Sequence, residues 1–168
     1  DPLVLQFGPT ELIEVFIRGM GTAGVFVLIA SGLSLIFGLM GVVNFAHGDL
    51  LLVGTYVGLA VLTATNQFWL ALVAAPLAVG LVGLAIERLT LQFTYDRDPL
   101  LQLLLTFGIA LILREGVQIV WGSVPKPIAT PTWGQGTVDL LLFTYPLYRI
   151  FIIVTTALLV LRLYLFIT

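Results

Sequence analysis

Long stretches without a charged residue constrain this chain more than any other feature of its sequence. Residues 19–46 and 50–86 contain no Asp, Glu, Lys, Arg or His, and these runs are 28 and 37 residues long. A helix needs about 20 mostly apolar residues to cross the hydrocarbon core of a bilayer. The second run is too long for one crossing, and its polar stretch 63–67 divides it into two segments.

The composition agrees with a membrane protein and excludes several other classes. Apolar residues make up 60% of the chain and charged residues 10%, against roughly 45–50% and about 25% in soluble domains. A water-soluble enzyme is therefore excluded, and seven Lys plus Arg residues leave no basic face for nucleic acid. The absence of cysteine and the single histidine exclude disulfides, thiolate zinc sites and multi-histidine metal sites. We expect no metal and no cofactor.

The runs predict an all-α integral membrane protein, folded as one transmembrane domain over residues 1–168. Five hydrophobic segments are expected, at about 19–42, 50–64, 68–87, 99–121 and 146–167. Segment 50–64 has 15 residues, which is short for a core about 30 Å thick. Three arrangements would account for this length: a re-entrant segment, a helix that begins before His47, or a tilted helix. A broken helix near 44–50 is the alternative to a re-entrant segment.

The positions of basic residues indicate an orientation. Connection 87–98 carries Arg88 and Arg97, whereas the polar loop 122–145 carries Lys126 alone. Basic residues favour the cytoplasmic side of a membrane. This predicts a cytoplasmic 87–98 connection and an extracytoplasmic 122–145 loop. The N-terminus then lies outside if 50–64 spans the membrane, and inside if it is re-entrant.

Four residues at the junction of the first two segments are candidates for function. Asn44, His47 and Asp49, with Gly48 between the last two, crowd this junction. Transporters place substrate or coupling-ion sites at broken helices near the middle of the membrane. An ordinary aqueous loop would hold the same residues without any function. A metal or hydrolytic site is disfavoured because no third ligand or nucleophile is evident.

A second candidate is the adjacent pair Arg114 and Glu115, about two-thirds of the way along segment 99–121. Neighbouring residues on a helix do not face each other, so the two need not pair together. Within the membrane they would need interior partners or water. Near its surface they would extend their charged ends toward the headgroups.

Small residues recur at helical spacing. Close approach of two helices in lipid is favoured where small side chains fall four residues apart on one face. Two such sets are candidates for helix packing: Ala30, Ser34 and Gly38 in the first segment, and Gly54 and Gly58 in the second.

Residues 32–49 carry a family resemblance. They read Gly-Leu-Ser-Leu-Ile-Phe-Gly-Leu-Met-Gly-Val-Val-Asn-Phe-Ala-His-Gly-Asp. This stretch resembles the signature of the membrane subunits of branched-chain amino acid ABC importers, including its Asn-Phe-Ala-His-Gly core at 44–48. Asp49 stands where that family usually has Glu, and the later stretch Thr106-Phe-Gly also fits. Arg114-Glu115 departs from the Gln or Asn more usual there.

The resemblance implies a permease subunit, without enzymatic activity, in the cytoplasmic membrane of a prokaryote. Its partners would be a homologous second permease subunit, two cytoplasmic ATPase subunits and an extracytoplasmic solute-binding protein. The chain carries no Gly-x-x-x-x-Gly-Lys-[Ser/Thr] phosphate loop of its own. Family members are longer, so the chain would correspond to their N-terminal part, as a truncated product, a piece of a larger chain or a degenerate copy.

Three alternatives remain open at this point. A urea or short-chain amide permease of the same family would have a similar signature. An ion-coupled secondary carrier or channel subunit would use a membrane-buried His47 and Asp49. A membrane enzyme using His47 would need acid, metal or nucleophile partners that the sequence does not supply.

Overall fold

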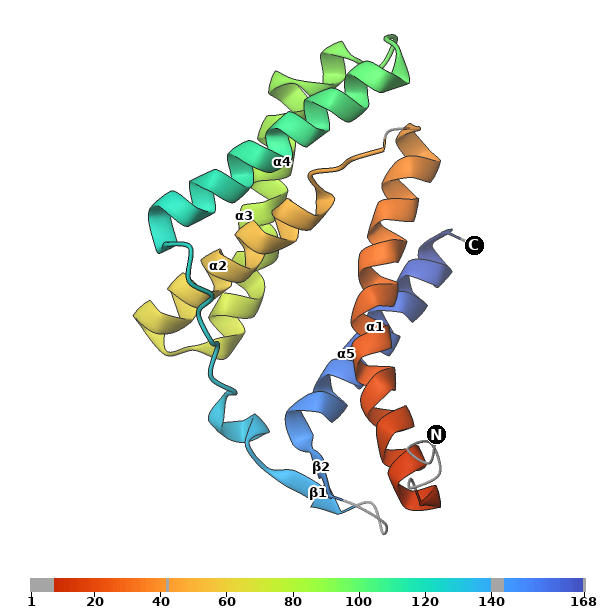
Figure 1. Ribbon diagram of the computed structural model, residues 1–168, viewed down its shortest axis with the longest axis vertical. Coiled ribbons are helices and arrows are strands. Elements are labelled where there is room, and N and C mark those ends of the chain that lie inside the picture. The colour runs from red at the N-terminus through yellow and green to blue at the C-terminus, as the bar shows by residue number, and fades with distance from the viewer. Residues whose placement is uncertain (1–7, 42, 140–143, 168) are drawn as a thin grey trace, which may run out of the picture. The chain divides into compact units, whose positions relative to one another are not determined.

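The structure is a computed structural model that describes residues 8–41, 43–139 and 144–167 (Figure 1). Five helices account for most of these residues, and each is long and apolar enough to cross a membrane. They are α1 (Pro9–Met40), α2 (His47–Thr65), α3 (Phe68–Leu89), α4 (Pro99–Trp121) and α5 (Leu147–Ile167). The predicted all-α membrane fold with five hydrophobic segments is confirmed.

Two helices begin earlier than the hydrophobic segments predict. Helix α1 extends back to Pro9, through a stretch where the amide of Gly8 donates to Glu11 Oε2 at 3.1 Å and Glu14 pairs with Arg18. A carboxylate near a helix N-terminus and an ion pair four residues apart both stabilise a helix. Helix α2 begins at His47 and has 19 residues, which gives it a length of about 28 Å. Helix α2 therefore begins three residues before segment 50–64, at His47 rather than ahead of it.

Residues 1–32 and 129–168 form one compact unit, and residues 33–128 form another. In the first unit, α1 comes near α5 at two glycines. A Cβ added to Gly21 would lie 3.6 Å from Ile153, and one added to Gly24 would lie 3.0 Å from Thr156. Such glycines let two helix backbones approach closely in a membrane.

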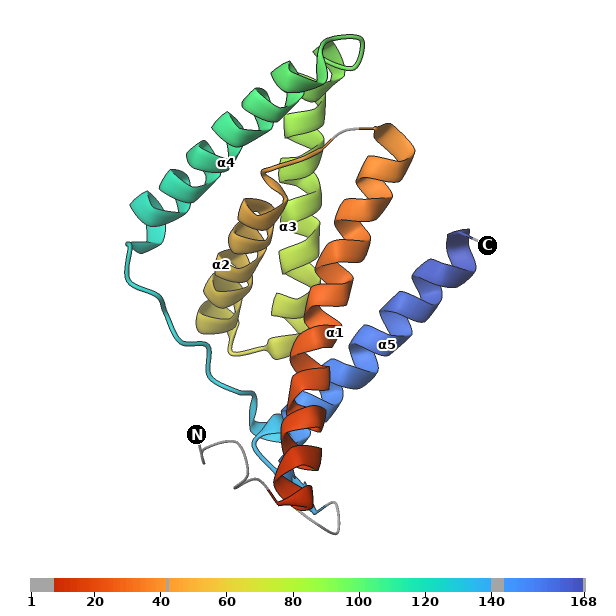
Figure 2. The same ribbon diagram turned by 45° about the vertical axis from the view of Figure 1, so that its right-hand side comes forward.

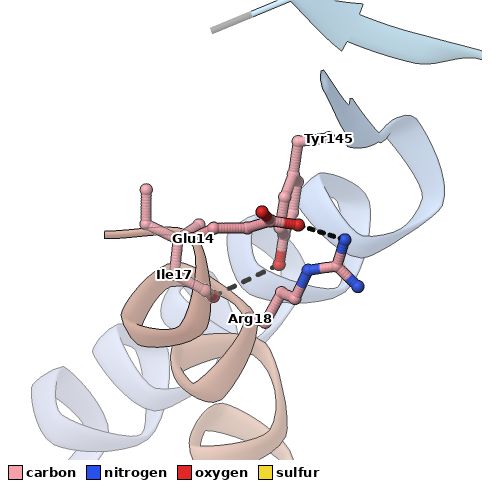
Figure 3. Close-up of polar contacts among 4 residues, drawn as sticks. All are labelled: Glu14, Ile17, Arg18 and Tyr145. Carbon is pink, nitrogen blue, oxygen red and sulfur yellow. Dashed lines mark hydrogen bonds and ion pairs between the residues drawn. The ribbon is translucent and has the colours of Figure 1, made fainter. Parts of the chain in front are cut away.

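A short antiparallel hairpin precedes α5 in the first unit. It pairs β1 (Thr137–Asp139) with β2 (Thr144–Pro146), with Val138 opposite Tyr145. The Tyr145 side chain is 1% exposed, and its hydroxyl donates to the carbonyl of Ile17 at 3.2 Å, beside the Glu14–Arg18 ion pair (Figure 3). This hydrogen bond ties the hairpin to α1.

The second unit contains α2, α3 and α4. Helices α2 and α3 form a hairpin joined by two residues, and Asn66 in that turn has the left-handed φ of 55° that Asn tolerates better than most residues. The connection from α3 to α4 is tied by Gln102, whose amide donates to the carbonyl of Thr94 at 2.8 Å. Asp98 caps α4 by accepting from the amide of Leu100 at 2.8 Å. Both α3 and α4 pack against α2. One transmembrane domain over 1–168, with an extracytoplasmic 122–145 loop, stays a prediction.

Candidate functional site

The connection between α1 and α2 is a break in helical structure rather than an extended loop. Gly41 leaves α1 with a left-handed φ of 66°. Asn44 then forms a tight turn, in which its Oδ1 accepts from the amide of Ala46 at 2.9 Å and its carbonyl accepts from the amide of His47 at 3.2 Å. Asn44 and Ala46 are both buried. Asn favours such turns because its short side chain can bond to the backbone two residues on.

This break lies well below the level at which α4 begins. Ala46 packs with Ile109 and Ala110 of α4, and Ile86 of α3 covers the same cluster. Ile109 is ten residues beyond Pro99, the first residue of α4, so it lies about 15 Å along the helix axis. Figures 1 and 2 show the connection to α2 below the α3–α4 turn. With α4 spanning the membrane, the break therefore lies at membrane depth.

Thr106 satisfies the exposed backbone of the break. Its side chain is fully buried, at 0% exposure. Its Oγ1 accepts from the amide of Phe45 at 3.3 Å and lies 3.0 Å from the carbonyl of Gln102, to which it donates. Non-helical backbone is tolerated at membrane depth where protein groups satisfy it. The sequence gives one signal for this role, a hydroxyl within the apolar run of α4, but assigns Thr106 no function.

An ion pair joins α2 to α4 beside the break. Arg114 donates from Nε to Asp49 Oδ1 at 3.0 Å and from an Nη to Asp49 Oδ2 at 3.4 Å. The Asp49 side chain is 8% exposed and the Arg114 side chain 56%. Arg114 therefore has a partner from another helix, and that partner is one of the residues singled out at the junction.

The remaining polar candidates are placed differently. Glu115 lies at an exposed position of α4, and it makes no hydrogen bond or ion pair with any residue that the structure describes. His47 is half-buried in the first turn of α2. A Cβ added to the exposed Gly48 would meet nothing within 4 Å, so packing does not require glycine there.

Arg114 also lines a groove of about 470 Å³ between α2, the last turns of α4 and the chain that follows α4. Leu52, Leu59 and Val117 form its apolar walls, and Lys126 supplies a second cation. Small-molecule sites in proteins are mostly apolar hollows of roughly 300–1,000 Å³ with a few polar groups. The groove has the size and chemical character of such a site, with the ion pair at one end.

The two sets of small residues lie in different surroundings. A Cβ added to Gly54 would lie 2.8 Å from Val79 of α3, and one added to Gly58 would lie 3.5 Å from Ala75. The Gly54 and Gly58 face therefore packs against α3. The other set is exposed: Ala30, Ser34 and Gly38.

Across the described ranges, no three His, Cys, Asp or Glu side chains come together in a way that would hold a metal ion. The fold and site define a multi-pass α-helical membrane protein with a helix break at membrane depth and an ion pair beside it.

Comparison with known proteins identifies the family. The profile described as branched-chain amino acid transport system, permease component, matches residues 15–168. The chain belongs to this family. Among its relatives, the high-affinity branched-chain amino acid transport system permease protein BraD of Pseudomonas aeruginosa PAO1 is 25% identical over 155 residues, covering 84% of this chain and 50% of BraD.

Two further relatives are permease proteins of the same printed description, named LivH. The protein of Escherichia coli K12 is 28% identical over 134 residues, and that of Salmonella typhimurium is 26% identical over 133 residues. Each match covers 74% of this chain and 42% of the relative. The chain thus spans about half the length of the curated relatives it matches or somewhat less. No solved structure gives a significant match.

Proposed function

We propose that this chain forms part of the membrane pathway of an ABC importer that moves branched-chain or other hydrophobic amino acids. The family match over residues 15–168 carries the proposal. The relatives named above are branched-chain amino acid permeases, which favours these substrates over the urea or short-chain amides of other family members.

The proposal includes the partners and the location. The pathway would be completed by a homologous second permease subunit. Energy would come from two cytoplasmic ATPase subunits, and substrate from an extracytoplasmic solute-binding protein. The assembly would lie in the cytoplasmic membrane of a prokaryote, in agreement with the bacterial relatives. Since α2 is long enough to span, the positive-inside rule puts the N-terminus and loop 122–145 outside.

The candidate site supports a transport role. Broken helices with polar groups at membrane depth are a recurrent feature of substrate pathways. With the orientation proposed above, α2 and α4 both run outward, so the groove opens toward the outer half of the membrane. The Asp49–Arg114 ion pair and the break would then lie between the groove and the cytoplasm.

Uptake by cells that lack the gene encoding this chain tests the proposal. Accumulation of radiolabelled leucine, isoleucine and valine at low concentration should fall, and the wild-type gene should restore it. Uptake should persist when a protonophore collapses the proton gradient while ATP is maintained, and it should stop when ATP is depleted. Unchanged amino acid uptake would refute the proposal, and uptake that follows the proton gradient would favour an ion-coupled carrier.

A further inference from the structure

We propose that the Asp49–Arg114 ion pair and the adjoining groove form a binding site for an apolar amino acid in its zwitterionic form. This inference rests on the proposed function and assigns the residues that would contact the substrate within the membrane. The ligand's carboxylate binds Arg114, its ammonium group binds Asp49, and its side chain lies in the groove.

The charged end of the site follows from the geometry of Arg114. A guanidinium has five N–H donors in a planar fork, and Arg114 uses two of them on Asp49. The remaining donors belong to a side chain that is 56% exposed and lines the groove. Arg binds carboxylates in a two-pronged geometry that a lysine cannot reproduce. A carboxylate entering the groove therefore meets a cation with donors to spare.

The carboxylate of Asp49 lies against the guanidinium of Arg114, and Arg114 lines the groove. Asp49, Leu52 and Leu59 share one face of α2, because residues three or four apart on a helix lie one above the other. Leu52 lines the groove, so Asp49 lies one turn below the groove wall. The carboxylate of Asp49 is buried and held by Arg114.

The apolar end of the site fits a hydrocarbon side chain. Leu52 and Leu59 of α2 face the groove together with Val117 of α4. Burying apolar surface against such walls stabilises a complex in proportion to the area removed from water. The groove thus presents an apolar surface with two cations in its lining, Arg114 and Lys126, and the carboxylate of Asp49 lies against Arg114 at its edge. An aliphatic side chain, a carboxylate and an ammonium group each have a counterpart there.

Binding of a zwitterion gives both members of the ion pair a second partner. The ligand's carboxylate takes the donors of Arg114 that Asp49 leaves free, and its ammonium group lies beside the carboxylate of Asp49. A ligand with a single charge would contact only one of the two. The site should therefore select zwitterions over amines and carboxylic acids of the same hydrocarbon shape.

Binding to the full protein tests this inference. The protein, with its membrane subunits in lipid nanodiscs and without any solute-binding protein, is titrated with tritiated L-leucine. The double variant Asp49→Asn/Arg114→Gln removes both charges and so leaves neither unpaired. It should weaken binding at least about tenfold. The matched control Glu14→Gln/Arg18→Gln removes an ion pair within α1 and should change the Kd by less than about twofold.

Ligand analogues provide a second measurement that needs no variant. Isoamylamine lacks the carboxylate of leucine, and 4-methylpentanoate lacks its ammonium group. Neither should displace tritiated leucine from the wild-type protein at concentrations where unlabelled leucine does. The inference is overturned if either analogue competes as well as leucine, if a folded double variant keeps the wild-type Kd, or if the wild-type protein binds no leucine. Loss of the proposed function would instead appear as unchanged amino acid uptake in the gene-deleted cells.

Discussion

Replacing Thr106 tests whether its hydroxyl holds the helix break together. The side chain is fully buried, and its Oγ1 accepts from the amide of Phe45 at 3.3 Å. Thr106→Val keeps the shape of the side chain and removes this acceptor, whereas Thr106→Ser keeps the hydroxyl and removes a methyl group. The two variants therefore separate hydrogen bonding from packing.

The expected magnitudes differ in a definite order. The hydrogen bond from the Phe45 amide to Thr106 is partly buried. An N–H shielded from water that loses its partner costs about 1–3 kcal/mol, so Thr106→Val should lower the free energy of unfolding by an amount in this range. The methyl group lost in Thr106→Ser is worth about 0.8 kcal/mol of apolar burial. We therefore expect the valine variant to be the less stable of the two, although it matches threonine better in shape.

Hydrogen–deuterium exchange of the full protein in nanodiscs gives a local measurement of this effect. The amide of Phe45 should exchange roughly 5- to 150-fold faster in Thr106→Val if exchange follows the opening free energy. Amides in α5 serve as the internal reference. A serine variant that is less stable than the valine variant, or an unchanged rate at Phe45, would refute the role assigned to Thr106.

Three other predictions concern helix packing, the ion pair and orientation. Gly54→Ala should destabilise the protein by about 1 kcal/mol, because the added Cβ would lie 2.8 Å from the side chain of Val79. Gly58→Ala should stabilise it by up to about 1 kcal/mol, because its Cβ would lie 3.5 Å from Ala75, an ordinary contact distance. Thermal unfolding measures both changes. Arg114→Gln should destabilise the protein more than Asp49→Asn, because it leaves the more buried charge of the pair alone. The chain has no cysteine, so Ser123→Cys introduces a single thiol. Because loop 122–145 is proposed to lie outside, this thiol should react with a membrane-impermeant maleimide added to intact cells.

Each of these predictions has an outcome that contradicts it. Equal melting temperatures for the two glycine variants would show that the α2–α3 contact is looser than the structure indicates. A greater loss of stability in Asp49→Asn would mean that Arg114, rather than Asp49, carries the uncompensated charge. Labelling of Ser123→Cys only after cell lysis would reverse the proposed orientation and place the groove toward the cytoplasm.

The sequence alone was sufficient for the membrane class, the number of helices and the family. Residues 19–46 and 50–86 contain no charge, and the cost of moving a segment from water into lipid depends mainly on that segment's own composition. Helix ends were harder to predict. The charges at the start of α1 stabilise the helix through local interactions, which a search for uncharged runs does not detect.

Tertiary structure decided which candidate residues meet. Asp49 and Arg114 are 65 residues apart, and the sequence predicted only that Arg114 would need an interior partner or water within the membrane, not which residue that partner is. It also gave equal weight to the two sets of small residues, of which Gly54 and Gly58 pack on α3 while Ser34 and Gly38 stay exposed.

The depth of the helix break also came from tertiary structure. A loop at the membrane surface and a break about 15 Å along α4 have the same local sequence. They differ in how far α2 is shifted along α4, which the packing of Ala46 against Ile109 and the bond from Phe45 to Thr106 determine. Helical periodicity specifies which face of a helix is apolar, but not where along its axis a neighbouring helix begins.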